Sequence, residues 1–167
     1  TRYESSAASD VYKRQKLDRR FGDSLKQLED PLCFAIIGLG KLGGRELTYH
    51  SDLDLIIVHS GKSKASQNDR LLIQEYGVKL IQRTIFLLTT ITRSGFAYTM
   101  DTRLRPSGNA GVLVTPWEVY FKYHRNSQAW EHQALVKGRI VAGASTQLES
   151  ERLIETIGEF SKPGWFE

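Results

Sequence analysis

Residues 51–59 read SDLDLIIVH, so that two carboxylates, Asp52 and Asp54, stand at the start of an apolar stretch. Apolar runs of this length are typical of strands that are covered on both faces of a sheet. Successive side chains of a strand alternate between its faces, which places both carboxylates on one face and Leu53 on the other. Adjacent carboxylates repel each other and lose hydration, and a bound cation would relieve both effects. Hard oxygen ligands without His or Cys favour Mg²⁺, with Mn²⁺ as the second option.

A third carboxylate, Asp101, ends an alternating stretch over residues 95–101, which predicts a further strand. If that strand continues, Arg103 and Arg105 share the face of Asp101. One edge of a small sheet would then hold three carboxylates and two guanidiniums, the groups that bind a nucleoside triphosphate through metal ions and bidentate phosphate contacts. The plainer alternative is that the carboxylates are ordinary strand-end residues and that Asp101 only pairs with Arg103.

A glycine-rich turn, GLGKLGG at residues 38–44, follows another apolar run and matches the dinucleotide-binding pattern G-x-G-x-x-G. A dinucleotide-binding fold needs a crossover helix after the turn, but only the seven residues 45–51 precede the next strand. The acidic residue that such folds carry about 20 positions further on is also missing. We therefore expect the turn to approach a triphosphate directly, through the backbone N–H groups of Gly43 and Gly44 and the charge of Lys41.

The rest of the chain predicts mainly helices. Apolar spacing indicates a helix over residues 68–90, and TPWE at 115–118 has the form of a capping box that starts another. In that helix Trp117, Tyr120, Phe121 and His124 form a stripe, which we interpret as core rather than as a base-stacking surface. Further helices are expected over 130–141 and 146–160. Residues 1–15 are polar and stay unassigned, so that the predicted domain covers 16–143.

Composition narrows the function only slightly. The 167 residues carry a net charge of +4, with 40% hydrophobic and 25% charged residues, as in a soluble globular domain. The sequence shows no basic stripe of the kind that would indicate nucleic-acid binding. No apolar run approaches the roughly 18 residues that a membrane span needs, so we expect no membrane association and a cytoplasmic location. A single cysteine excludes an intrachain disulfide.

Four motifs in order resemble the glutamine synthetase adenylyltransferase family. They are GLGKLGGREL at 38–47, SDLDL at 51–55, DTRLRPSG at 101–108 and WEHQAL at 130–135. The resemblance implies an α+β, polymerase β-like nucleotidyltransferase fold, with a small mixed sheet flanked by helices. It also implies ATP and Mg²⁺ as reactants, a tyrosine of glutamine synthetase as the acceptor, and regulation by the PII signalling protein.

The resemblance also assigns roles to individual residues. Asp52, Asp54 and Asp101 would be catalytic and would hold the metal ions, and Asp101 would help to deprotonate the acceptor phenol. The nucleotide would be bound by Gly43, Gly44, Ser51, Lys41, Arg103 and Arg105.

Family members are several times longer and carry two such domains, one that attaches AMP and one that removes it by phosphorolysis. We therefore expect the chain to be a fragment, with residues 144–167 starting a further helical region. The motifs favour the AMP-attaching domain, while the AMP-removing domain and a silent nucleotide- or PII-binding module remain alternatives.

Overall fold

A computed structural model describes residues 34–60, 67–93, 95–126 and 129–143 of the chain. The unassigned segment 1–15, the predicted helix 146–160 and the proposed helical continuation 144–167 lie outside the described residues.

Within the described residues, five strands form one mixed sheet in the order β3-β2-β1-β5, with β4 also paired to β2. Strand β1 (Phe34–Gly38) runs antiparallel to β2 (Leu53–His59) and to β5 (Arg139–Gly143). Strands β3 (Met100–Asp101) and β4 (Thr115–Pro116) are short and parallel to β2, β3 at its start and β4 at its end. The antiparallel pairing of β1 with β2 confirms that no crossover unit of the dinucleotide-binding kind follows the glycine-rich turn.

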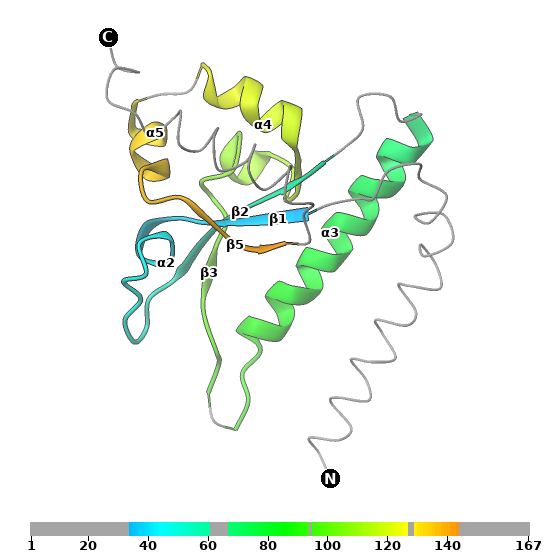
Figure 1. Cartoon of the computed structure of the whole chain (residues 1–167). Helices are drawn as coiled ribbons and strands as arrows, with labels where there is room; N and C mark the ends of the chain where they lie inside the picture. Colours follow the sequence, from blue (N-terminus) through cyan, green and yellow to red (C-terminus); the bar gives the residue numbers. More distant parts are fainter. Residues whose placement is uncertain (1–33, 61–66, 94, 127–128, 144–167) are drawn as a thin grey trace.

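Helices cover the sheet on both sides. The long helix α3 (Gln67–Thr89) lies on one side, and the short helices α4 (Trp117–His124) and α5 (Ala129–Leu135) lie on the other (Figure 1). A helical turn, α2 (Gly40–Gly43), follows β1 directly, and a 3₁₀ turn, η1 (Gly108–Ala110), lies between β3 and β4. The fold is therefore α+β, a small mixed sheet flanked by helices, as the sequence predicts, and this arrangement is consistent with a nucleotidyltransferase-like fold.

Alternation along β2 divides the core into two clusters. Ile56 and Val58 pack with Tyr120 and Leu135 beneath α4 and α5, while Leu53 and Leu55 belong to the cluster that contains residues of α3. Both faces of β2 are thus covered, which explains its nearly continuous apolar sequence.

Three local predictions were wrong. The helix expected over 130–141 is shorter, because α5 ends at Leu135. The Gly138 N–H donates to the Leu135 carbonyl (2.7 Å) and closes a turn there. The β-branched residues that follow join the sheet as β5. The strand expected over 95–101 is reduced to β3, since Tyr98 donates its N–H to Leu88 of α3 (3.1 Å) instead of to a neighbouring strand.

The capping box at 115–118 does not form. Pro116 occupies the N-cap position of α4 with no side-chain cap, and the hydroxyl of Thr115 is buried inside the protein. Thr115 instead contributes its backbone to β4, where it pairs with Val58. No helix in the described part of the chain is long and apolar enough to cross a membrane.

The aromatic stripe of α4 is core, as predicted. Tyr120 is fully buried and stacks on Trp117 (ring centroids 5.5 Å apart), and His124 is 1% exposed with its ring 4.4 Å from that of Tyr120. Burial lowers the pKa of His124 to about 4.

This burial predicts acid sensitivity. An unfolded histidine has a pKa of about 6.5, so the unfolded chain binds the proton more tightly than the folded one. The free energy of unfolding should therefore be unaffected by this group above pH 6.5, and should fall by about 2–3 kcal/mol on acidification toward pH 4. His124→Gln cannot titrate at this position, so its free energy of unfolding should fall less on acidification, by about the same 2–3 kcal/mol. Urea denaturation at a series of pH values measures this difference. Equal pH dependence in both proteins would contradict the assignment.

Candidate active site

The pairing of β2 with β3 sets two carboxylates side by side. In this parallel pair Asp54 lies opposite Asp101, and Leu53 lies opposite Met100. Directly paired residues of neighbouring strands point to the same face. Leu53 and Met100 belong to the cluster beneath α3, so the two carboxylates lie on the other face of the sheet.

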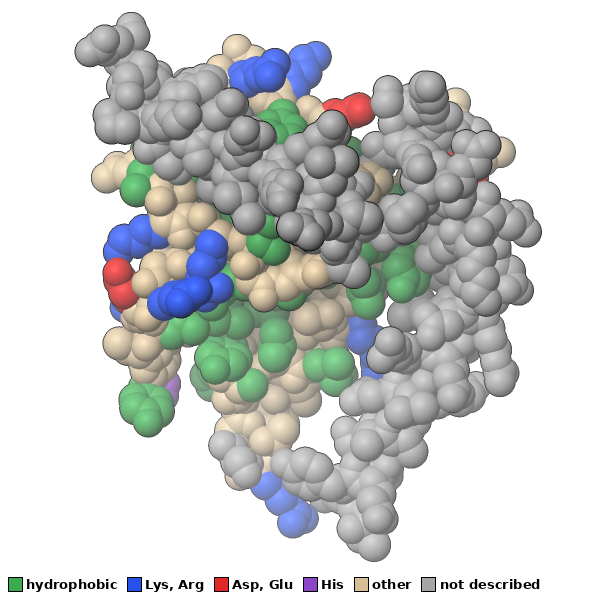
Figure 2. All heavy atoms as spheres, in the orientation of Figure 1, with side chains coloured by type: hydrophobic (Ala, Val, Ile, Leu, Met, Phe, Trp, Pro, Cys, Tyr) green, Lys and Arg blue, Asp and Glu red, His purple; other side chains and the backbone are tan. Residues whose placement is uncertain are grey.

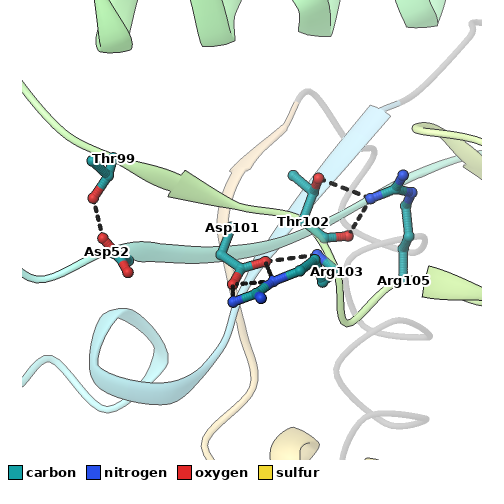
Figure 3. Close-up of polar contacts among 6 residues, drawn as sticks. All are labelled: Asp52, Thr99, Asp101, Thr102, Arg103 and Arg105. Carbon is teal, nitrogen blue, oxygen red and sulfur yellow. Dashed lines mark hydrogen bonds and ion pairs between the residues drawn. The ribbon is translucent and has the colours of Figure 1, made fainter. Parts of the chain in front are cut away.

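The third carboxylate, Asp52, completes what we call the acidic edge, formed by Asp52, Asp54 and Asp101. Figure 3 shows Asp52 and Asp101 of this edge with their partners. The pKa of Asp54 is raised, first by burial and then by the negative charges of Asp101 and Asp52, while Arg103 opposes the shift. Asp52 and Asp101 are thus close enough for their negative charges to raise the pKa of Asp54. They do not converge on one point, because no three His, Cys, Asp or Glu side chains among the residues that the structure describes are grouped to hold a metal ion.

Two of the carboxylates are bonded to protein partners. Asp52 accepts a hydrogen bond from the hydroxyl of Thr99. Asp101 accepts the backbone N–H of Arg103 (2.8 Å) and two hydrogen bonds from its Nε (3.0 and 2.8 Å), and forms an ion pair with its Nη2. These contacts with Arg103 hold the pKa of Asp101 below its usual range. Asp101 is therefore ionised but a weak base, which argues against its predicted role in deprotonating the acceptor while Arg103 is bound.

The hydrogen bond from the Arg103 amide to Asp101 also turns the chain, so β3 ends there and the strand does not continue to Arg105. The guanidinium of Arg105 instead donates to Thr102, at its carbonyl (2.6 Å) and its hydroxyl (2.9 Å), and to the Gly111 carbonyl (3.3 Å). Arg105 thus stabilises the loop that follows β3. The prediction that Arg105 shares the strand face of Asp101 was wrong, and its nucleotide-binding role stays a prediction.

The glycine-rich turn lies against the acidic edge. The amide of Leu39 donates to the Asp54 carbonyl (2.9 Å), and a Cβ on Gly40 would lie only 2.6 Å from an oxygen of the Asp54 carboxylate. Gly40 also has a φ of +50°, in the region that favours glycine. A side chain at this position would therefore displace the Asp54 carboxylate.

The other predicted nucleotide-binding residues around the turn have mostly internal contacts. The amides of Gly43 and Gly44 donate to the carbonyls of Leu39 (2.8 Å) and Gly40 (3.0 Å), so both close the turn. Ser51 accepts the Thr48 amide (3.1 Å) and shares a hydrogen bond with the Thr48 hydroxyl (2.8 Å). The side chain of Lys41 is exposed beside the turn. Contacts of these four residues with a nucleotide stay predictions.

The sequence did not predict that Arg139 contacts the glycine-rich turn. Its Nε donates to the Gly43 carbonyl (2.9 Å) and its Nη2 to the Leu42 carbonyl (3.0 Å), so it fixes the C-terminal end of α2. An ion pair between Lys137 and Glu46 (2.7 Å) joins the same two segments. The available signal was the pair of β-branched residues after Arg139, which favours a strand where a helix was predicted.

A small mixed sheet whose paired strands present carboxylates beside a glycine-rich turn defines a nucleotidyltransferase-like domain. Residues 6–153 match the family model of glutamate-ammonia ligase adenylyltransferase, and the chain belongs to this family. The match includes most of the segment 1–15 that the sequence had left unassigned.

A relative from Hahella chejuensis (strain KCTC 2396) is named bifunctional glutamine synthetase adenylyltransferase/adenylyl-removing enzyme. It is 50% identical over 113 residues, which cover 66% of this chain. They cover only 12% of the relative, so the chain spans a small part of that protein's length.

The two adjacent glycines of the turn should respond differently to the same substitution. A Cβ on Gly43 would lie 2.1 Å from the backbone oxygen of Lys137 and 2.7 Å from that of Gly38, so Gly43→Ala should destabilise the protein by about 2 kcal/mol or more. A Cβ on Gly44 would meet only the flexible side chains of Lys137 and Glu46, at 3.0 and 3.1 Å. Gly44→Ala is the matched control and should stay within about 0.5 kcal/mol. Urea denaturation measures both, and equal losses would contradict this packing.

Proposed function

We propose that this domain transfers AMP from ATP to a tyrosine of glutamine synthetase. The observation that carries the proposal is the β2–β3 register, which sets Asp54 beside Asp101 next to the glycine-rich turn. Membership of the adenylyltransferase family and the name of the Hahella relative support the substrate. Regulation by PII and a cytoplasmic location are part of the proposal on the resemblance alone.

The acidic edge is proposed to bind Mg²⁺, with Mn²⁺ as a substitute. Its donors are all carboxylate oxygens, the ligands that hard cations prefer. Burial, and then the negative charges of Asp101 and Asp52, raise the pKa of Asp54, and a cation would neutralise that like charge. For Asp52 and Asp101 to become ligands, each must release its present partner, Thr99 or Arg103. The bound metal would supply charge neutralisation at the reacting phosphate.

Arg103 is proposed to exchange partners when the nucleotide binds. Its guanidinium is largely exposed and now takes the Asp101 carboxylate through several donors. Phosphate oxygens fit the same planar fork of donors. The exchange would place Arg103 on the triphosphate and free Asp101 in one movement. Lys41, Gly43 and Gly44 of the glycine-rich turn, together with Ser51 just before β2, are proposed to complete the phosphate site.

The acceptor phenol has a free pKa of about 10, so the transfer needs a proton acceptor near neutral pH. In the described arrangement Asp54 has a raised pKa and Asp101 a lowered one. On the proposed partner exchange Asp101 loses the Arg103 contacts that lower its pKa, and we assign proton acceptance to Asp101.

Removing either paired charge should abolish transfer without unfolding the protein. Asp54→Asn and Asp101→Asn should each lower the rate of AMP incorporation from labelled ATP into glutamine synthetase by at least about 100-fold. The two variants differ in stability, because Asp54 is repelled by its neighbours while Asp101 is paired with Arg103. The unfolding temperature of Asp54→Asn should be unchanged or higher, and that of Asp101→Asn unchanged or lower. Substantial residual transfer in either variant would contradict the assignment.

The direction of the reaction can be read from its second substrate. The AMP-attaching activity needs ATP and releases pyrophosphate, whereas the AMP-removing activity needs inorganic phosphate and adenylylated glutamine synthetase. We expect labelled ATP to modify the synthetase in the absence of phosphate. Release of ADP from the adenylylated synthetase that depends on added phosphate, without labelling from ATP, would instead identify the AMP-removing domain.

A further inference from the structure

A cavity of about 1120 Å³ opens beside the acidic edge. Two segments line it, 47–52 before β2 and 95–99 before β3. In Figure 1 the first segment lies at the left, below α2, and the second lies at the bottom, leading into β3. We call this cavity, with its two lining segments, the loop groove.

The loop groove is lined by exposed aromatic side chains. Tyr49 is 97% exposed, Phe96 48% and Tyr98 44%. Figure 2 shows hydrophobic side chains at the surface in this lower part of the molecule. Tyrosine and other aromatic side chains that stand free of the core are the residues that most often dominate the energy of protein–protein contacts.

The floor of the groove is continuous with the acidic edge. Asp52 lines the groove, and its negative charge helps to raise the pKa of Asp54. Thr99 also lines the groove, and its hydroxyl donates a hydrogen bond to the Asp52 carboxylate. In Figure 3 the pair of Asp52 and Thr99 lies at one end of the edge, with Asp101 and Arg103 further along. Arg103 and the groove therefore lie toward opposite ends of the edge, and Ser51, a proposed phosphate partner that also lines the groove, directly precedes Asp52 where the two regions meet.

This order fits the geometry of phosphoryl transfer, in which attacking and leaving oxygens lie roughly in line on opposite sides of the phosphorus. If the leaving pyrophosphate is held at the Arg103 end, the attacking hydroxyl must come from the groove end. We propose that the loop groove binds the acceptor polypeptide and directs its hydroxyl-bearing side chain past Asp52 to the paired carboxylates. This inference rests on the proposed function.

The size of the groove argues for a polypeptide rather than for the adenine ring. Pockets for whole drug-sized ligands usually measure about 300–1,000 Å³, so a single base would fill only a fraction of this space. An extended protein segment can occupy a cavity of this volume and contact aromatic residues on both lining segments.

Binding measurements distinguish the proposed role of the loop groove from the transfer reaction itself. Phe96→Ala and Tyr49→Ala should weaken the binding of immobilised glutamine synthetase by at least about tenfold, as expected for aromatic contacts at an interface. Leu71→Ala, at an exposed position of α3 outside the groove, is the matched control and should bind as the unchanged protein does. The affinity of a fluorescent ATP analogue, measured in parallel, should stay within about twofold in all three variants.

Asp54→Asn provides the opposite control, because it should lose AMP transfer while keeping its affinity for the synthetase. Weakened binding of the ATP analogue, with synthetase binding intact, would show a base-binding site and overturn the inference. Unchanged binding of both ligands, or no binding of the synthetase by the unchanged protein, would overturn it too. Failure of the proposed function would look different: the synthetase would bind in a groove-dependent way but would never become labelled from ATP.

Discussion

The site depends on a single pairing, the parallel contact of β3 with the start of β2. It is only two residues long, yet it sets Asp54 beside Asp101 and directs both away from the core beneath α3. The backbone hydrogen bond from Leu53 to Thr99 (2.9 Å) extends the contact and brings Thr99 to Asp52. The burial of β2 on both faces fixes the position of these carboxylates, because shifting the register by one residue would turn Asp54 into the core and Leu53 out of it. The burial and the like charge that together raise the pKa of Asp54 are thus imposed by the packing of the sheet.

The surrounding segments keep the acidic edge open to a substrate. Gly40 brings the turn against the Asp54 carboxylate, and Arg139 holds the far end of α2 from β5. On the other side, Arg103 covers Asp101 with an exposed guanidinium that can be displaced. The contacts of Gly40 and Arg139 are therefore structural, whereas Thr99 and Arg103 hold two carboxylates through contacts that we propose are exchanged on binding. Such an arrangement suits a site that must bind a charged substrate and release it again.

The sequence predicted the fold class correctly, and it placed Asp54 and Asp101 on neighbouring strands as the structure has them, because both follow from strong local patterns. The roles of the three carboxylates stay predictions. The apolar run after Asp54 specifies a doubly covered strand, and alternation before Asp101 indicates the neighbouring one. The rest depended on contacts that no local pattern encodes. Arg103 bonds back to Asp101 and ends the strand, so Arg105 is directed into its own loop. The strand β5 was missed because the predicted helix ran through Gly138, where the chain turns between α5 and β5, and the contact of Arg139 was missed with it.

The central claim is that Asp54 and Asp101 act as one pair in binding the nucleotide with its metal. Calorimetric titration with a non-hydrolysable ATP analogue, with and without Mg²⁺, tests this most directly. We expect Mg²⁺ to strengthen binding to the unchanged protein by at least about tenfold, and to have little effect on Asp54→Asn, Asp101→Asn or the double variant. If Mg²⁺ strengthened binding equally in all four proteins, the paired carboxylates would not be the metal site and the account would be wrong.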